Sequence, residues 1–223
     1  MPQPGTRAPL ALLLDLDGTL VDTIPLILAC ARHTFERHGL DAPTDAEWST
    51  GIGTPLTAQF RPFARDDSHL ASMLTAYRDR QRELHDVLIR EYAGVREALA
   101  ELEAEGRPVA IVTSKAHDLA LRALNFAGMR DLVDVVVGVE ATTHHKPHPE
   151  PVEHALRLLG RAREDAVFIG DSPHDIGSGR AAGVTTVGVT WGAFSREALE
   201  ASGADHVIDR VDQFVPLIRA LQR

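Results

Sequence analysis

Cysteine is almost absent from the 223-residue sequence, because Cys30 is the only one. A single thiol cannot form an intrachain disulfide, and nothing else argues for an oxidising compartment. Long hydrophobic runs are also absent: the apolar run Leu10–Leu14 stops at Asp15. This run is too short for a signal peptide or a membrane span, so we expect a cytoplasmic protein with no membrane partner.

Positive charge is scarce, since 23 Lys and Arg face 32 Asp and Glu, which gives a formal net charge of −9. Most of such a surface would repel a nucleic-acid backbone, so we expect no nucleic-acid partner, and any bound anion must meet a local positive site. We find no internal repeat and no low-complexity tract. The composition, 44% hydrophobic and 25% charged, is that of a folded globular protein. The length suits one α/β core with a smaller insertion.

Helices and short apolar strands alternate regularly after Gly94. This alternation predicts a parallel, doubly wound sheet with right-handed crossovers, an α/β fold. The predicted strands are Pro9–Leu14, Val109–Val112, Val133–Val137, Ala166–Ile169, Thr185–Val189 and a last one near Val207. The predicted helices are Val95–Glu105, His117–Phe126, Pro149–Leu159, Asp175–Ala182 and Val211–Leu221.

The stretch between the first strand and Gly94 has a different, all-helical pattern. It shows no strand pattern between Val21 and Arg90, and a Gly51-Ile52-Gly53 loop separates the predicted amphipathic helices Pro25–Arg37 and His69–Ile89. We therefore predict a core domain of residues 1–22 and 91–223, interrupted by a helical domain of residues 23–90. Hinges are expected near Val21–Thr23 and Arg90–Gly94.

Polar side chains follow the predicted strands at the point where each strand ends. In an open parallel sheet these positions meet at one edge, where ligands bind. The residues concerned are Asp15, Asp17, Gly18 and Thr19 after the first strand, Thr113 and Ser114 after the second, and Asp171, Ser172 and Asp175 after the fourth, with Lys146 before a helix.

Carboxylates gathered at this density resist ionisation unless a cation neutralises them, so the sequence predicts a bound metal ion. Oxygen ligands favour Mg²⁺, and the expected ligands are Asp15, Asp171 and the backbone carbonyl of Asp17. A lysine and backbone amides beside that ion could hold phosphate oxygens. The pattern therefore indicates phosphoryl transfer on a small phosphorylated metabolite.

The segments Asp15–Leu20, Thr113, Lys146 and Gly170–Asp175 resemble, in order and spacing, the four motifs of the haloacid dehalogenase superfamily. The resemblance covers nearly the whole chain and is closest to the phosphoglycolate-phosphatase-like subgroup, which also includes pyrophosphatases. It implies a Rossmann-like core with a small, all-helical cap inserted after the first motif.

The resemblance also implies roles for single residues. Asp15 would be the nucleophile that forms an aspartyl-phosphate, and Asp17 would act as general acid and then as general base. Thr113 and the backbone at Ser114 would bind the transferring phosphoryl group, and Lys146 would balance its charge. Many relatives have Asn at the position of Ser114, but a backbone contact tolerates this difference.

The remaining implied roles concern the metal ion and the first turn. Asp171 would bind Mg²⁺, and Asp175 would bind it through water or orient its ligands, unless Asp175 is a plain helix N-cap. Gly18 and Thr19 would contribute to substrate binding. Gly51-Ile52-Gly53 remains open between a simple turn and a substrate-facing loop.

Several alternatives remain beside hydrolysis of a phosphoglycolate-type phosphomonoester. The nearest is an inorganic pyrophosphatase; a phosphomutase similar to beta-phosphoglucomutase is another, although Thr19 resembles phosphatases. Asp17 disfavours a dehalogenase, and the complete set of acids disfavours a non-enzymatic scaffold. The spacing of His144, His145 and His148 does not indicate zinc.

Some features of the chain support no assignment. The arginines at 78, 80 and 82 are interpreted as the outer face of a helix, while Arg61 or Arg65 could line a closed cap. The sequence does not distinguish a monomer from a homodimer.

Overall fold

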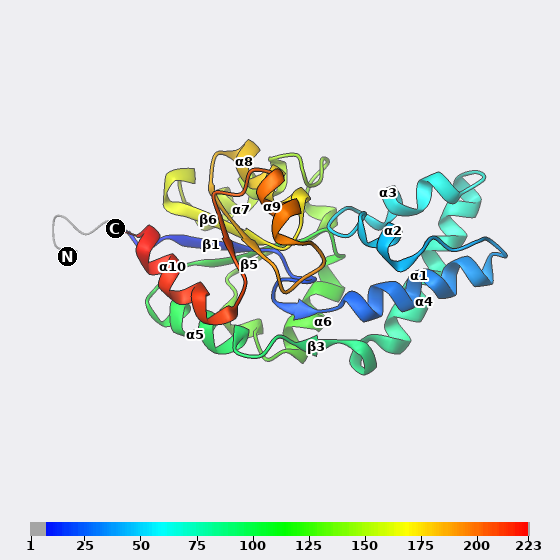
Figure 1. The fold of residues 1–223 in the computed structure, drawn as a ribbon, viewed down its shortest axis with the longest axis horizontal. Coiled ribbons are helices and arrows are strands. Elements are labelled where there is room, and N and C mark those ends of the chain that lie inside the picture. The colour runs from blue at the N-terminus through cyan, green and yellow to red at the C-terminus, as the bar shows by residue number, and fades with distance from the viewer. Residues whose placement is uncertain (1–7, 223) are drawn as a thin grey trace.

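The computed structural model describes residues 8–222; residues 1–7 and 223, which the predicted core range includes, lie outside the described part. Its centre is a six-stranded parallel sheet of order β5-β4-β1-β6-β7-β8, with helices on both faces (Figure 1). The strands are β1 (Ala11–Leu14), β4 (Val109–Val112), β5 (Val135–Val137), β6 (Ala166–Gly170), β7 (Thr185–Val189) and β8 (His206–Ile208). The predicted doubly wound α/β fold is therefore confirmed.

Strand β1 is buried on both faces because it lies between β4 and β6, with Leu12 opposite Val109 and Val167. Side chains alternate between the two faces of a strand. Leu12 and Leu14 accordingly pack with α5 (Val95–Ala104), α6 (His117–Phe126) and α10 (Phe214–Leu221), whereas Leu13 packs with α7 (Glu150–Leu159) and α8 (Pro173–Ala182). Burial on both faces explains why the run is continuously apolar and why the strand ends before the charged residue Asp15.

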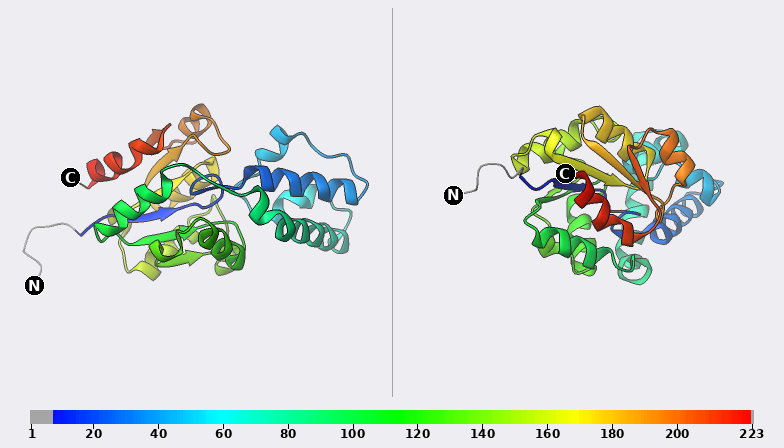
Figure 2. Two further views of the ribbon diagram at one scale, coloured as in Figure 1. Left: turned by 90° about the horizontal axis from the view of Figure 1, so that it is seen from below. Right: turned by 60° about the vertical axis from the view of Figure 1, so that its left-hand side comes forward.

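Four helices form a separate unit beside the carboxyl edge of the sheet, which we call the cap (residues 24–89). They are α1 (Ile24–Arg37), α2 (Asp45–Ser49), α3 (Leu56–Phe60) and α4 (Asp67–Leu88). The cap has its own apolar core, in which the rings of Phe35, Trp48 and Phe60 pack against one another. Figure 2 shows the cap at one end of the molecule, with α10 at the other.

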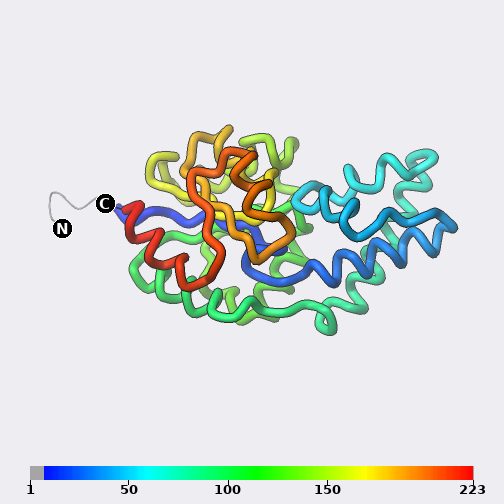
Figure 3. Tube along the Cα trace, in the orientation of Figure 1, coloured from blue at the N-terminus to red at the C-terminus, as the bar shows by residue number. Residues whose placement is uncertain are grey.

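Two short strands join the cap to the core, where the sequence predicted hinges but no strand. β2 (Val21–Asp22) pairs antiparallel with β3 (Arg90–Glu91), so that Val21 faces Glu91. Figure 3 traces the chain entering and leaving the cap through these neighbouring segments. Two-residue strands are too short to produce a recognisable periodicity, which is why the sequence did not reveal them.

Several predicted boundaries were wrong by one to three residues; β1 begins at Ala11 rather than Pro9, for example, and α4 begins at Asp67 rather than His69. β5 begins at Val135 rather than Val133; just before it, the Asp134 N–H donates to the Val109 carbonyl at 2.9 Å and the Asp134 carboxylate accepts the Val109 N–H at 2.8 Å. α8 begins at Pro173 rather than Asp175, since Ser172 is its N-cap. α10 begins at Phe214, after a 3₁₀ turn at Val211–Gln213.

The remaining short elements were not predicted from the sequence. They are the cap helices α2 and α3, the core helix α9 (Arg196–Ala201) and the 3₁₀ turns Arg61–Phe63, Arg130–Leu132, Val139–Ala141 and Arg163–Asp165. Within residues 8–222, no helix is both long and apolar enough to cross a membrane.

Candidate active site

The first loop of the site starts where β1 ends, with Asp15. The backbone N–H of Asp15 donates to the carbonyl of Ile169 at 2.9 Å, so the sheet itself holds this residue. Gly18, in the same loop, has φ +83°, and a Cβ there would lie 2.3 Å from Asp171 Oδ2. Only glycine combines this backbone conformation with so close an approach, which lets the loops after β1 and β6 meet.

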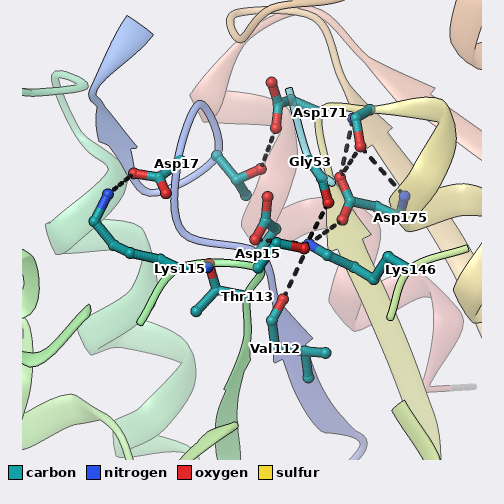
Figure 4. Close-up of polar contacts among 12 residues, drawn as sticks. Asp15, Asp17, Gly53, Val112, Thr113, Lys115, Lys146, Asp171 and Asp175 are labelled. Carbon is teal, nitrogen blue, oxygen red and sulfur yellow. Dashed lines mark hydrogen bonds and ion pairs between the residues drawn. The ribbon is translucent and has the colours of Figure 1, made fainter. Parts of the chain in front are cut away.

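Lys146 lies between two carboxylates at the floor of the site (Figure 4). Its Nζ is 2.9 Å from Asp15 Oδ1 and 2.6 Å from Asp175 Oδ1, and it also donates to the carbonyl of Val112 at 3.2 Å. The other oxygen of Asp175 accepts bonds from the backbone N–H and the hydroxyl of Ser172 at the start of α8. Asp175 is thus the third residue of a capping box rather than the N-cap, and it orients Lys146.

Asp171 is fixed from both sides by the loops around it. Its Oδ1 accepts the Thr19 hydroxyl at 3.1 Å, and its Oδ2 accepts the backbone N–H of Ala193 at 2.7 Å. A Cβ at Gly192 would lie 2.2 Å from Asp171 Oδ2, so the backbone packs directly on this carboxylate. Asp171 is therefore held in place before any ligand binds.

The buried acids carry more negative charge than Lys146 offsets. Burial raises the pKa of Asp15 to about 7 despite the nearby Lys146, and the charges of Asp175 and Asp17 act in the same direction. Burial, followed by Asp175 and Asp15, raises the pKa of Asp171 well above its usual range. Burial alone would lower the pKa of Lys146, but Asp15 and Asp175 outweigh it and raise that pKa. Full ionisation of the site needs further positive charge.

The same carboxylates fit a divalent cation. Asp15, Asp171 and Asp175 are buried and each offers an oxygen within 4.8 Å of the others. An all-oxygen set with excess negative charge suits Mg²⁺. Asp175 pairs with Lys146 and Ser172, whereas both Asp171 oxygens accept from the neutral donors Thr19 and Ala193. Asp15 and Asp171 therefore remain the predicted ligands. The Asp17 side chain lies outside this cluster, as expected if only its backbone carbonyl contributes.

Lys115 is a site residue that sequence reasoning missed. This buried lysine lies 2.6 Å from Asp17 Oδ1, and the Thr23 hydroxyl donates to the same oxygen at 2.6 Å. Both contacts fall on Oδ1, which leaves Asp17 Oδ2 for a ligand. One signal was present: Lys115 and Lys146 are the only lysines in the sequence.

The predicted phosphate-binding residues divide into two groups. Thr113 and Ser114 line a cavity of about 120 Å³ between core and cap, beside Asp15. Gly18 and Thr19 are not part of the lining: the Gly18 N–H donates to the carbonyl of Val21, and Thr19 holds Asp171. Gly18 and Thr19 therefore stabilise the loops of the site and do not line the cavity.

The cap closes the cavity through the Gly51-Ile52-Gly53 loop. The Ser114 hydroxyl donates to the carbonyl of Gly53 at 2.6 Å, and a Cβ at Gly53 would lie 2.7 Å from Ser172 Oγ. Ile52 and Gly53 line the cavity. This segment is thus a site-facing loop, and the core and cap are in contact across the site.

The placement of Arg78 corrects the interpretation that all three arginines of α4 lie on its outer face. Arg78 is solvent-exposed but contributes to the wall of the cavity, as does Gln81 one turn later. Arg61 instead borders a separate groove between the cap and the core loop of residues 143–149. Which side chains reach the cavity depends on how the cap helices are oriented relative to the core. Helical periodicity alone does not reveal that orientation.

The histidines near Lys146 interact with one another and with an acid. His144 stacks on His148, with ring centroids 4.4 Å apart, and its Nδ1 lies 2.7 Å from Glu150 Oε2. Backbone N–H groups of Thr143 and His144, together with that imidazole, lower the pKa of Glu150 to about 2. Each group thus has a partner that stabilises the loop before α7.

Comparison with known proteins agrees with this architecture. Residues 12–189 match the family model of the haloacid dehalogenase-like hydrolases. The chain is 39% identical to a PpaX protein of Caldanaerobacter subterraneus, over 94% of each chain. It is 36% identical to the pyrophosphatase PpaX of Bacillus cereus, over 95% of this chain and 97% of that one.

A solved structure extends the comparison to three dimensions. The crystal structure of a haloacid dehalogenase-like protein from Bacteroides fragilis superposes with a TM-score of 0.86 at 30% identity, over 92% of this chain and 99% of the other. Sequence and structure thus lead to the same family, and the resemblance predicted from the four motifs is confirmed. The chain belongs to the haloacid dehalogenase-like hydrolases.

Proposed function

We propose that this protein is a Mg²⁺-dependent phosphohydrolase that forms an aspartyl-phosphate on Asp15, with inorganic pyrophosphate as its preferred substrate. The observation that carries the proposal is the arrangement at the cavity floor. Asp15 is paired with Lys146, and Asp17 lies beside it with one oxygen fixed and the other available. A nucleophile and a separately held acid suit a two-step displacement.

In the first step, an Asp15 oxygen forms a bond to phosphorus while the bond to the leaving oxygen breaks. Asp17 transfers a proton to that leaving oxygen. In the second step, Asp17 accepts a proton from water, the water oxygen bonds to the same phosphorus, and the bond to Asp15 breaks to release phosphate. Thr113 and the Ser114 backbone would contact the phosphoryl oxygens throughout.

Positive charge at the cavity floor makes the displacement feasible. Lys146 balances the charge of Asp15 and of the approaching phosphoryl group. Asp15, Asp171 and the Asp17 carbonyl would hold Mg²⁺, which supplies further neutralisation of the phosphate when bound. Asp175 would keep Lys146 in position through its 2.6 Å contact. The cap, covering residues 24–89 within the predicted range 23–90, would shield the first transfer step from bulk solvent.

Two observations favour pyrophosphate over the phosphoglycolate-type monoester that the motifs first suggested. Relatives 36% identical over nearly the whole chain carry the name pyrophosphatase. The cavity is small, and the cation Arg78 lies in its wall on the cap side, which suits a compact, highly charged anion. A cytoplasmic location and a monomeric or homodimeric state remain predictions.

The proposal is tested by measuring phosphate release from pyrophosphate, phosphoglycolate, sugar phosphates and nucleotides, with Mg²⁺ and with chelator. We expect metal-dependent release that is fastest from pyrophosphate, and at least about 10⁴-fold less from Asp15→Asn. Preference for another phosphate ester would overturn the substrate assignment. Normal turnover by a folded Asp15→Asn variant would overturn the mechanism.

A further inference from the structure

Two polar side chains on the cap side of the cavity have no part in the displacement described above. Arg78 and Gln81 are three residues apart on α4, so they lie on one face of that helix. Both line the cavity opposite Asp15, Asp17 and Lys115 of the core.

Gln81 is only 5% exposed, and its amide hydrogen-bonds to no residue between 8 and 222. Buried amides are normally paired, because an unpaired one loses its hydrogen bonds to water without replacement. Since the side chain borders the cavity, its two N–H donors are available to a molecule inside it. This arrangement indicates a ligand with acceptor oxygens.

Arg78 also lacks an ion-pair partner in the described part of the chain, unlike the other two arginines of α4. Arg80 pairs with Glu83 at 2.8 Å, and Arg82 pairs with Asp79 at 2.9 Å. Arg78 has no ion pair within residues 8–222. In a chain of net charge −9, an arginine at a cavity wall without a carboxylate partner is a local positive site for an anion.

The turn of α4 that carries these residues also lies near the proposed proton donor. Burial raises the pKa of the adjacent Tyr77 well above its usual range, and Cys30 and Asp17 add to this effect. Tyr77 borders the cavity with Asp17. A group that leaves from phosphorus next to Asp17 would therefore move towards Arg78 and Gln81.

We propose that Arg78 and Gln81 form an anion subsite for the leaving phosphate of a diphosphate substrate, and that they determine specificity. The identity of the leaving group rests on the proposed function. The second phosphate of pyrophosphate would accept hydrogen bonds from the Arg78 guanidinium and the Gln81 amide. The aryl group of a monoester offers these donors no phosphate oxygens, so the subsite favours a charged phosphate as leaving group.

The kinetic test compares pyrophosphate with 4-nitrophenyl phosphate. Arg78→Gln and Gln81→Leu should each lower kcat/KM for pyrophosphate by about 10-fold or more and change that for the aryl phosphate less than about twofold. The matched control is Arg80→Gln, which removes a paired arginine two residues away and should change neither. Equal losses on both substrates, or no loss on pyrophosphate, would overturn the subsite.

A binding measurement separates this inference from the proposed reaction. Calorimetry with methylenediphosphonate and methylphosphonate, each with Mg²⁺, requires no turnover. Arg78→Gln should weaken diphosphonate binding about 10-fold and leave methylphosphonate binding unchanged. Unchanged diphosphonate binding would refute the subsite. A selective loss, combined with no pyrophosphate hydrolysis by the unmodified protein, would support the subsite and refute only the reaction.

Discussion

The Ser114 hydroxyl donates a hydrogen bond of 2.6 Å to the carbonyl of Gly53, and this bond joins the core to the cap across the cavity. Ser114 follows the buried strand β4, whereas Gly53 belongs to the cap loop that covers the site. We expect this bond to break when the cap moves away from the core. Through this bond Ser114 would stabilise the closed position of the cap, in which we expect the reaction to take place.

Replacing Ser114 by Ala should weaken closure without unfolding the core. The loss of one neutral hydrogen bond corresponds to a roughly two- to tenfold fall in kcat/KM for pyrophosphate, and steady-state kinetics would measure it. Ser49→Ala, on the exposed part of the cap, provides the control. If Ser114→Ala matches the unmodified protein in activity, the bond has no role in closure.

Lys115 should act through Asp17 rather than by binding substrate. Lys115→Met removes one of two donors that fix Asp17 Oδ1, so proton transfer becomes less well oriented. We expect kcat to fall by about 10²-fold with little change in KM. Thr23→Val removes the other donor and should show the same pattern more weakly. A raised KM at constant kcat would instead make Lys115 a substrate-binding residue.

The motifs could be predicted from sequence because they depend on strand ends. Asp15, Thr113 and Asp171 each follow a buried apolar strand, and parallel strands bring such positions to one edge. Lys115 could not be placed in this way, because a long flexible side chain beyond a strand end can reach several partners. Arg78 could not be placed either, since its position depends on how the cap meets the core.

Stability should depend on pH in a way set by the crowded carboxylates. The pKa of Asp15 is raised to about 7 in the folded protein, so between about pH 4 and pH 7 the folded state binds more protons there than the unfolded state. Asp171 shifts in the same direction. Stability of the metal-free protein should therefore fall as pH rises through this range, by about 1.4 kcal/mol per unit of pKa difference at most.

Mg²⁺ should counter this loss because it neutralises the ionised carboxylates. Thermal unfolding with chelator and with Mg²⁺ would measure the effect, and we expect the rise in Tm to be larger at pH 8 than at pH 5. Asp171→Asn should remove most of the Mg²⁺ response. An equal rise at both pH values would argue against metal binding at these carboxylates.

Removal of the cap should leave the core folded but abolish substrate selectivity. The cap has its own apolar core, and β2 and β3 hold its two ends side by side, with Asp22 opposite Arg90. A short Gly-Ser linker in place of residues 24–89 should leave a folded sheet, measurable by circular dichroism. Discrimination between pyrophosphate and 4-nitrophenyl phosphate should be lost. Retained preference for pyrophosphate would show that residues of the core determine specificity for the leaving group.

The covalent intermediate tests the central claim most directly. Radiolabelled pyrophosphate would be mixed with the protein and Mg²⁺, the reaction quenched in acid, and the labelled peptide identified after digestion. We predict a hydroxylamine-labile label on the peptide containing Asp15, absent from Asp15→Asn. Rapid phosphate release under the same conditions with no label on Asp15, or with label on another residue, would contradict the account.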